Sequence, residues 1–230
     1  MSQITRRMRQ VHNVLALVVG AQVLLWIVSG LFFTLFPIET IRGEPLRAAV
    51  EETLVPPEGG WLVPSEISAG ASRVTLKPWL GRAVYVVEAE GETRMLDAAT
   101  GEVLSPLDEA AARAVAEHGW AGQGALQTAS LIAKAPSESG RSGQLMWRVE
   151  FDGADKATLW ITPDTGEVRA VRTGLWRTYD LLWGLHIMDW SARETFTTWW
   201  IKAMAFGALA MTLAGIWLLV GRVKGGRLLR

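Results

Sequence analysis

The sequence predicts a membrane protein in which two transmembrane α-helices flank an extracytoplasmic α+β domain. Two apolar runs lie near opposite ends of the 230-residue chain, and all 23 acidic residues fall between them. The segment between the runs alternates apolar and polar residues and is punctuated by glycine-containing turns, as β-hairpins are. Length and composition therefore indicate one domain of ordinary size together with two spans.

Residues 14–36 form the first apolar run, "VLALVVGAQVLLWIVSGLFFTLF", which contains no charged residue. At about 1.5 Å per residue a helix of this length covers about 34 Å, enough to cross a hydrocarbon core. A cleaved secretory signal is the alternative interpretation, but its apolar region is usually about 7 to 15 residues long. No A-x-A-like site follows before Pro37. We therefore expect a transmembrane helix here.

The second apolar run, "WWIKAMAFGALAMTLAGIWLLV", carries one charge, Lys202, close enough to one end to reach the interface. Within this run Ala203, Gly207, Met211 and Gly215 recur every four residues. Such a ridge of small residues allows two helices to approach closely. The ridge therefore predicts helix pairing, within the chain or across a dimer.

The charge distribution predicts the topology. Basic residues flank the two runs at the chain ends, namely Arg6, Arg7, Arg9, Arg222, Lys224, Arg227 and Arg230. By the positive-inside rule both termini are expected in the cytoplasm and the acidic middle segment outside. Basic residues are outnumbered and scattered in that segment, which argues against nucleic-acid binding. The absence of cysteine excludes thiolate metal sites, so a redox centre would need histidine or methionine ligands.

Two blocks of the middle segment, residues 83–106 and 145–171, each predict a strand, a turn, a second strand and a closing Thr-Gly-Glu-Val turn. Gly101 and Gly166 can supply the positive φ that such a turn needs. Residues 107–117 predict a helix capped by Asp108, and residues 123–133 predict a weaker one. The result is an α+β domain of two hairpin-plus-helix units.

These paired hairpins, placed between two spans, resemble the PepSY domain of the PepSY-associated transmembrane proteins of bacterial inner membranes. "RRMRQVHNVLALVVG" resembles that family's Arg-x-x-His opening, and "LHIMDW" resembles its Leu-His-x-x-Asp element before the last helix. The "VSG" and "LAG" steps inside the runs are also similar to those of the family. Larger members of the family include ferrisiderophore reductases that carry b-type haems on transmembrane histidines.

With this resemblance the chain divides into six predicted segments. They are a cytoplasmic N-terminus (1–13), the first transmembrane helix (14–36), a periplasmic PepSY-like domain (37–173), an interfacial amphipathic helix and connector (174–197), the second transmembrane helix (198–221) and a cytoplasmic C-terminus (222–230).

The resemblance implies haem b, and His12 and His186 are the candidate iron ligands. The two imidazoles are expected about 30 Å or more apart, at opposite membrane faces, so they cannot ligate one haem. A second ligand would come from a parallel homodimer, from a partner subunit or from a methionine thioether. Arg9, one turn before His12, could pair with a propionate. The alternative is that His12 is an ordinary interfacial residue beside a small-residue helix contact.

Around His186, Trp176, Trp183 and Trp190 recur every seven residues and predict an amphipathic helix at the outer interface. Asp189, one turn after His186, could accept the proton on Nδ1 and orient the ring. The alternative is an aromatic membrane anchor with an incidental histidine. His118, after the domain helix, is expected to be a surface residue.

Two functions follow from these patterns. The first is a haem b protein that carries electrons across the inner membrane. It would reduce ferric iron or a ferric siderophore, and it would work as a homodimer or with a partner subunit. The second is a non-catalytic accessory protein whose PepSY-like domain binds a periplasmic protein, an envelope protease or a larger membrane complex.

Overall fold

The computed structural model describes residues 3–49, 53–67 and 70–224. Arg227 and Arg230, on which part of the predicted topology depends, lie outside the described residues, as do the first two residues of the predicted N-terminal segment. The chain forms two compact units. One, the helical unit, contains residues 1–37 and 178–230, and the other, the sheet unit, contains residues 38–177.

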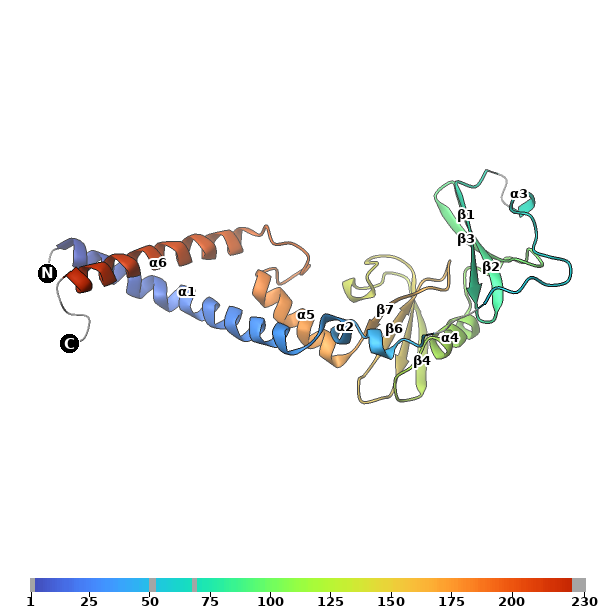
Figure 1. The fold of residues 1–230 in the computed structure, drawn as a ribbon, viewed down its shortest axis with the longest axis horizontal. Helices are drawn as coiled ribbons and strands as arrows, with labels where there is room; N and C mark the ends of the chain where they lie inside the picture. Colours follow the sequence, from blue (N-terminus) through green and yellow to red (C-terminus); the bar gives the residue numbers. More distant parts are fainter. Residues whose placement is uncertain (1–2, 50–52, 68–69, 225–230) are drawn as a thin grey trace. The chain divides into compact units, whose positions relative to one another are not determined.

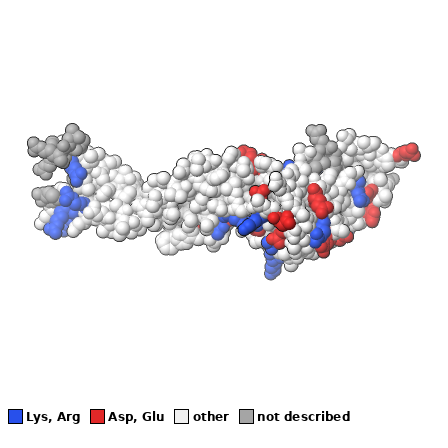
Figure 2. Space-filling model, turned by 90° about the horizontal axis from the view of Figure 1, so that it is seen from below, with Lys and Arg blue, Asp and Glu red and all other residues white. Residues whose placement is uncertain are grey.

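Two long apolar helices dominate the helical unit, α1 (Gln3–Leu35) and α6 (Trp199–Lys224) (Figure 1). Both are long and apolar enough to cross a membrane. Their central surface carries no charge in Figure 2, whereas basic side chains gather at the end where α1 begins and α6 ends. The predicted pair of long apolar helices is therefore present, and each is longer than the apolar run that predicted it.

The helices α1 and α6 run antiparallel and touch through the small residues of α6. A Cβ atom built on Gly207 would lie 3.1 Å from Val19, and one built on Gly215 would lie 3.2 Å from the Cε1 atom of His12. Ala214, beside them, is buried. The prediction that this ridge serves helix pairing is confirmed, and the pairing occurs within the chain.

A shorter helix, α5 (Gly174–Ile187), leads from the sheet unit into the helical unit. Met188 follows it with a positive φ of 54°, and the N–H of Asp189 donates to the carbonyl of Gly184 at 3.1 Å. This six-residue closure is the Schellman motif that ends many helices. The helix therefore stops at Ile187, well before the end of the predicted interfacial segment 174–197.

The end of α5 corrects the predicted tryptophan face. Trp190 lies beyond the helix and packs on Trp200, with ring centroids 5.7 Å apart. Trp176 lies under the guanidinium of Arg172 in the sheet unit. Trp183 packs on aromatic rings of the helical unit. The three indoles therefore do not form one face of a single helix, because the Schellman turn ends the helix between the second and the third.

The sheet unit contains two antiparallel sheets (Figure 1). The first is β1 (Arg73–Trp79), β2 (Arg82–Ala89) and β3 (Glu92–Asp97); the second is β4 (Leu126–Ile132), β5 (Met146–Phe151), β6 (Thr158–Ile161) and β7 (Val168–Arg172). The helix α4 (Glu109–His118) lies between them in sequence. Short helical turns also occur at α2 (Ile38–Ile41), α3 (Pro64–Ile67), Glu44–Leu46 and Ser137–Ser139.

One apolar core joins both sheets to α4. Trp79, Met95, Val115, Val149 and Leu159 are among its buried members. Burial of such side chains, at about 25 cal/mol per Å² of apolar surface, is the main stabilising contribution in a domain of this kind. The two predicted hairpins are present as β2–β3 and β5–β6.

Several local predictions for this unit are confirmed and one is wrong. Asp108 caps α4 by accepting the N–H of Ala111 at 2.8 Å, and Gly101 and Gly166 have φ of 76° and 61°. The predicted helix over residues 123–133 is instead the edge strand β4. The strand pairs with β5, whose residues lie about twenty positions further along the chain. This pairing, which is distant in sequence, overrides the local helical spacing.

Candidate functional site

His12 lies on α1 at its contact with α6, where it is half-buried. Its Nδ1 atom lies 3.1 Å from the main-chain carbonyl oxygen of Met211. A carbonyl oxygen only accepts hydrogen bonds, so Nδ1 carries the proton and donates it. In the neutral ring, Nε2 is then the nitrogen with a free lone pair, which is the atom that can bind a metal.

His186 lies in the last turn of α5 and is also half-buried. Its Nδ1 atom lies 2.7 Å from the hydroxyl oxygen of Ser29 on α1. The Ser29 hydroxyl is also 2.6 Å from the carbonyl oxygen of Leu25, one turn earlier.

Three side chains of α1 hold the end of α5. Gln22 donates from Nε2 to the carbonyl of Leu185 at 3.3 Å, and Trp26 donates from Nε1 to the carbonyl of His186 at 2.7 Å. These carbonyls belong to the last turn of a helix, where no partner exists within the helix itself. With Ser29, the three residues place the main chain and the ring of His186.

Aromatic rings surround the His186 imidazole on the helical unit. The ring of Phe33 meets it edge-on, with centroids 5.5 Å apart, and the ring of Trp26 lies at 6.4 Å. Phe33 also packs against Tyr179 at 4.9 Å. Two aromatic rings therefore flank the half-buried imidazole, which is not simply displayed on an interfacial helix.

The two histidines occupy different levels of α1. His186 lies beside Ser29, not beyond the end of the apolar run as the sequence suggested. Seventeen residues separate His12 from Ser29, which is about 25 Å along a helix. This is somewhat less than the predicted 30 Å, but two imidazoles at this spacing still cannot ligate a single iron.

Asp189 has a different role from the one predicted. Its carboxylate accepts the N–H groups of Ala192, Glu194 and Thr195 and the hydroxyl of Ser191, at 3.1 to 3.3 Å. Burial raises its pKa, but these donors together lower the pKa below the usual value. Because Nδ1 of His186 is bonded to Ser29, Asp189 acts on the loop that follows α5 and not on the ring.

The same loop is fixed to α5 by a second set of contacts. The guanidinium of Arg193 pairs with the carboxylate of Asp180 on α5. The main-chain carbonyl of Arg193 accepts the indole N–H of Trp183 at 3.2 Å. Gly184 leaves room for the Arg193 side chain, since a Cβ there would lie 3.0 Å from it. The loop is therefore folded back on the helix that carries His186.

The remaining predicted residues are placed as follows. Arg9 lies on α1, one turn before His12, and its pairing with a propionate stays a prediction. His118 is the last residue of α4 and is exposed. Gly20 is a small residue two turns after His12 on α1, and it faces open space, since a Cβ built there would meet nothing within 4 Å. Room for a ligand beside α1 is therefore present on that face.

The sequence prediction missed Gln22, Trp26 and Ser29, although a signal for them exists. They are spaced i, i+4 and i+7 and so lie on one face of α1. Each carries a hydrogen-bonding group within a segment that is otherwise almost entirely apolar. Such a face predicts a polar partner, but the partner, His186, is 157 residues away in sequence.

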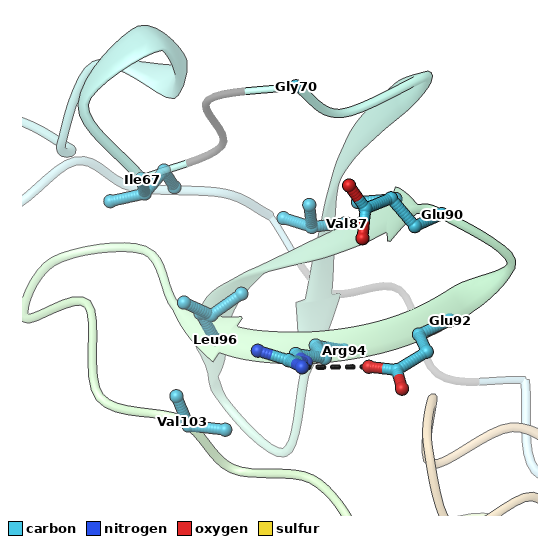
Figure 3. Close-up of a pocket in the computed structure, with 9 residues that line it drawn as sticks. Ile67, Gly70, Val87, Glu90, Glu92, Arg94, Leu96 and Val103 are labelled. Atoms are coloured by element: carbon cyan, nitrogen blue, oxygen red, sulfur yellow. Dashed lines mark hydrogen bonds and ion pairs between the residues drawn. The ribbon is translucent and has the colours of Figure 1, made fainter.

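A separate hollow of about 470 Å³ opens on the sheet β1–β2–β3 (Figure 3). Its apolar lining includes Ile67, Val87, Leu96 and Val103. At its rim Arg94 pairs with Glu92 at 2.7 Å. The hollow lies over the sheet face that carries the buried Tyr85 and Val87, away from the main core.

Comparisons of the chain with models of protein families, with curated proteins and with solved structures gave no match. The site must therefore be judged from its own chemistry. Among residues 3–49, 53–67 and 70–224, no three histidine, aspartate or glutamate side chains converge as metal ligands would. Within these residues, His12 and His186 are therefore not part of a three-ligand cluster.

Proposed function

We propose that this chain is a membrane-embedded haem b protein that carries electrons from one membrane face to the other. The observation that carries the proposal is the shared state of the two imidazoles. Both bond through Nδ1, to a carbonyl and to a hydroxyl, and the described part of the chain gives neither Nε2 atom a hydrogen-bond partner. Histidine ligands of metals typically have this arrangement, with the second nitrogen bonded to an oxygen.

If each imidazole holds a haem iron, a second ligand would come from outside its own site. The close contact of α1 with α6 at Gly207 and Gly215 leaves no room for a macrocycle between these two helices. A haem would therefore lie on an outer face of the helical unit. A second copy related by a two-fold axis along the membrane normal would bring His12 opposite His12 and His186 opposite His186. We propose this homodimer, with a partner subunit as the alternative source of ligands.

The proposed topology has both termini in the cytoplasm of a bacterial cell and the sheet unit in the periplasm. The basic ends of α1 and α6 support it. The similarity of the short histidine motifs to PepSY-associated proteins supports the same arrangement. When bound, haem would supply reversible one-electron transfer, and the outward acceptor we propose is ferric iron or a ferric siderophore. The role of the chain's own residues is to hold the two imidazoles at fixed levels of α1.

The test is a reduced-minus-oxidised absorption spectrum of the protein purified in mild detergent from cells with adequate haem. We expect a Soret band and an α band, with about two haems per dimer if each pair of imidazoles binds one. His12→Asn and His186→Asn should each remove about half of the haem, because an asparagine amide can replace the Nδ1 donor but not the Nε2 ligand. His118→Asn is the matched control and should leave the haem content unchanged.

A colourless protein from haem-replete cells would refute the proposal. Unchanged haem in both asparagine variants would refute the ligand assignment even if the wild-type protein is coloured. Thermal unfolding of each variant should be recorded in parallel. A folded variant that lacks haem separates loss of a ligand from loss of structure.

The hollow on the first sheet favours a second candidate function, a non-catalytic accessory protein that binds a periplasmic protein. Its apolar floor and charged rim are the features of a recognition surface. Under this proposal Leu96→Asp would abolish capture of an envelope partner, while Arg73→Asp, at the exposed start of β1, would not. Equal capture by both variants would count against the hollow.

A further inference from the structure

We propose that Ser29 is a positioning residue that holds the His186 ring in the tautomer with its proton on Nδ1, so that Nε2 is free to bind iron. The inference rests on the proposed function for its consequence, but the tautomer itself is a property of the protein alone. Ser29 lies in α1, far from His186 in sequence, and it is not part of the histidine motif around His186.

The argument begins with the proton of the Ser29 hydroxyl. A hydroxyl has one proton and two lone pairs. The carbonyl of Leu25 lies 2.6 Å from Oγ and the carbonyl of Trp26 lies 3.3 Å from it, so the proton points to Leu25. Donation to the carbonyl four residues earlier is a common arrangement for serine in helices. The hydroxyl then has only lone pairs to offer to His186.

While its proton is donated to Leu25, the hydroxyl accepts from His186, so Nδ1 is the donor across the 2.7 Å contact. Ser29 is 2% exposed, so water does not compete for its lone pairs. In the opposite tautomer the hydroxyl would have to turn its proton to Nδ1 and give up its 2.6 Å bond to the Leu25 carbonyl. The geometry therefore selects one of the two neutral forms.

The surrounding contacts prevent the ring from turning away from Ser29. Trp26 and Gln22 hold the carbonyls of His186 and Leu185, which fixes the main chain from which the ring extends. Phe33 closes one edge of the imidazole. With its base and one edge fixed, the ring keeps Nδ1 towards Ser29 and Nε2 on its other side.

An oxygen acceptor on Nδ1 also changes the ligand's strength. It makes the imidazole a better electron donor through Nε2, which stabilises the more highly charged ferric state. Loss of such a partner typically weakens metal binding about 10- to 100-fold. Ser29→Ala should therefore raise the midpoint potential of the haem on the His186 side and speed its loss, without a direct effect on the His12 side.

The first measurement uses the protein without haem. The chain has three histidines, so ¹⁵N spectra of histidine-labelled protein in detergent can be assigned with His12→Asn and His118→Asn variants. We expect His186 in the Nδ1–H form in the wild-type protein and a mixture of tautomers in Ser29→Ala. Equal tautomer populations in the two proteins would overturn the proposal.

The second measurement is the midpoint potential of the protein with haem, compared between Ser29→Ala and a variant that keeps the hydroxyl. Ser29→Thr keeps a hydroxyl and should restore the tautomer and the potential. The matched control is Thr34→Ala, which removes an exposed hydroxyl that also donates to a main-chain carbonyl of α1, that of Leu31, and it should change neither. A potential that shifts equally in Thr34→Ala and Ser29→Ala would overturn the proposal, since the shift would then follow from loss of any hydroxyl on α1. Absence of haem from all proteins refutes the proposed function, and the tautomer measurement then decides the role of Ser29 by itself.

Discussion

His12 and His186 have the same hydrogen-bonding state, but the protein produces it in two different ways. At His12 the acceptor is a main-chain carbonyl, that of Met211, brought close by the packing of α6 on α1. At His186 the acceptor is a side chain, Ser29, on the helix that α5 packs against. The first site therefore depends on how closely two long helices approach, and the second depends on the identity of one residue.

The two sites also differ in what surrounds them. His12 is in the middle of continuous helix on both sides, so its position follows from regular geometry over many residues. His186 is at a helix end that is completed by the Met188 turn and the Asp189 loop. We expect substitutions in the helix pair to affect mainly the first site and substitutions at the helix end to affect mainly the second.

The largest effect is expected from Gly215→Leu. A Cβ at this position already lies 3.2 Å from the His12 ring, so a leucine side chain must displace the ring or separate the helices. Overpacking of this kind costs about 1–3 kcal/mol. The unfolding temperature in detergent should fall and haem on the His12 side should be lost, while the His186 tautomer stays unchanged.

Gly20→Leu is the matched control, because a Cβ there meets nothing within 4 Å and the residue lies on the same helix as His12. Leucine is the better helix former by up to about 1 kcal/mol, so the unfolding temperature should stay level or rise. If Gly20→Leu lowered the unfolding temperature of the haem-free protein as much as Gly215→Leu does, the His12 site would not owe its geometry to the α1–α6 contact.

A smaller effect is expected from Trp26→Phe, which removes the donor to the His186 carbonyl. A hydrogen bond of this kind contributes about 1 kcal/mol net. Hydrogen exchange of the last turn of α5 should speed up, and the Met211 contact of His12 should be unaffected. A uniform increase in exchange along α6 would contradict the separation of the two sites.

Regular elements of this fold could be predicted because their signals are local. The lengths of the apolar runs, the Asp108 cap and the glycines of the two Thr-Gly-Glu turns each act within a few residues. The strand β4 could not be predicted, because a bulge between Leu126 and Thr128 disturbs the alternation of its side chains. Its apolar residues are then spaced much as in a helix, and only pairing with β5 decides its conformation.

The candidate site shows the same limit. The histidines were identifiable from their short motifs, but their partners were not. The prediction chose Asp189 for His186 because a residue three positions later lies one turn away in a continuing helix. The helix instead ends with Met188 at positive φ, where glycine is the usual residue and would have marked the stop. Because nothing in the sequence marks the end of α5, the three tryptophans were also predicted to lie on one face of a single helix.

The smallest effect is expected from protonation of Asp189, which tests the loop behind His186. Its pKa lies below the usual value of about 4, because loop N–H groups stabilise the carboxylate more than burial disfavours it. The stabilisation is thus complete above the unfolded pKa and is lost as the pH falls through the lower folded pKa. Relative to its rate in Asp189→Asn at the same pH, the amide of Thr195 in the wild-type protein should exchange more slowly at about pH 6 than at about pH 3, because protonation at low pH makes the wild-type side chain neutral like that of the variant. Equal exchange-rate ratios at the two pH values would show that the loop is held by the Arg193–Asp180 ion pair and not by Asp189. The hydrogen bond between His12 and the Met211 carbonyl should not change at either pH.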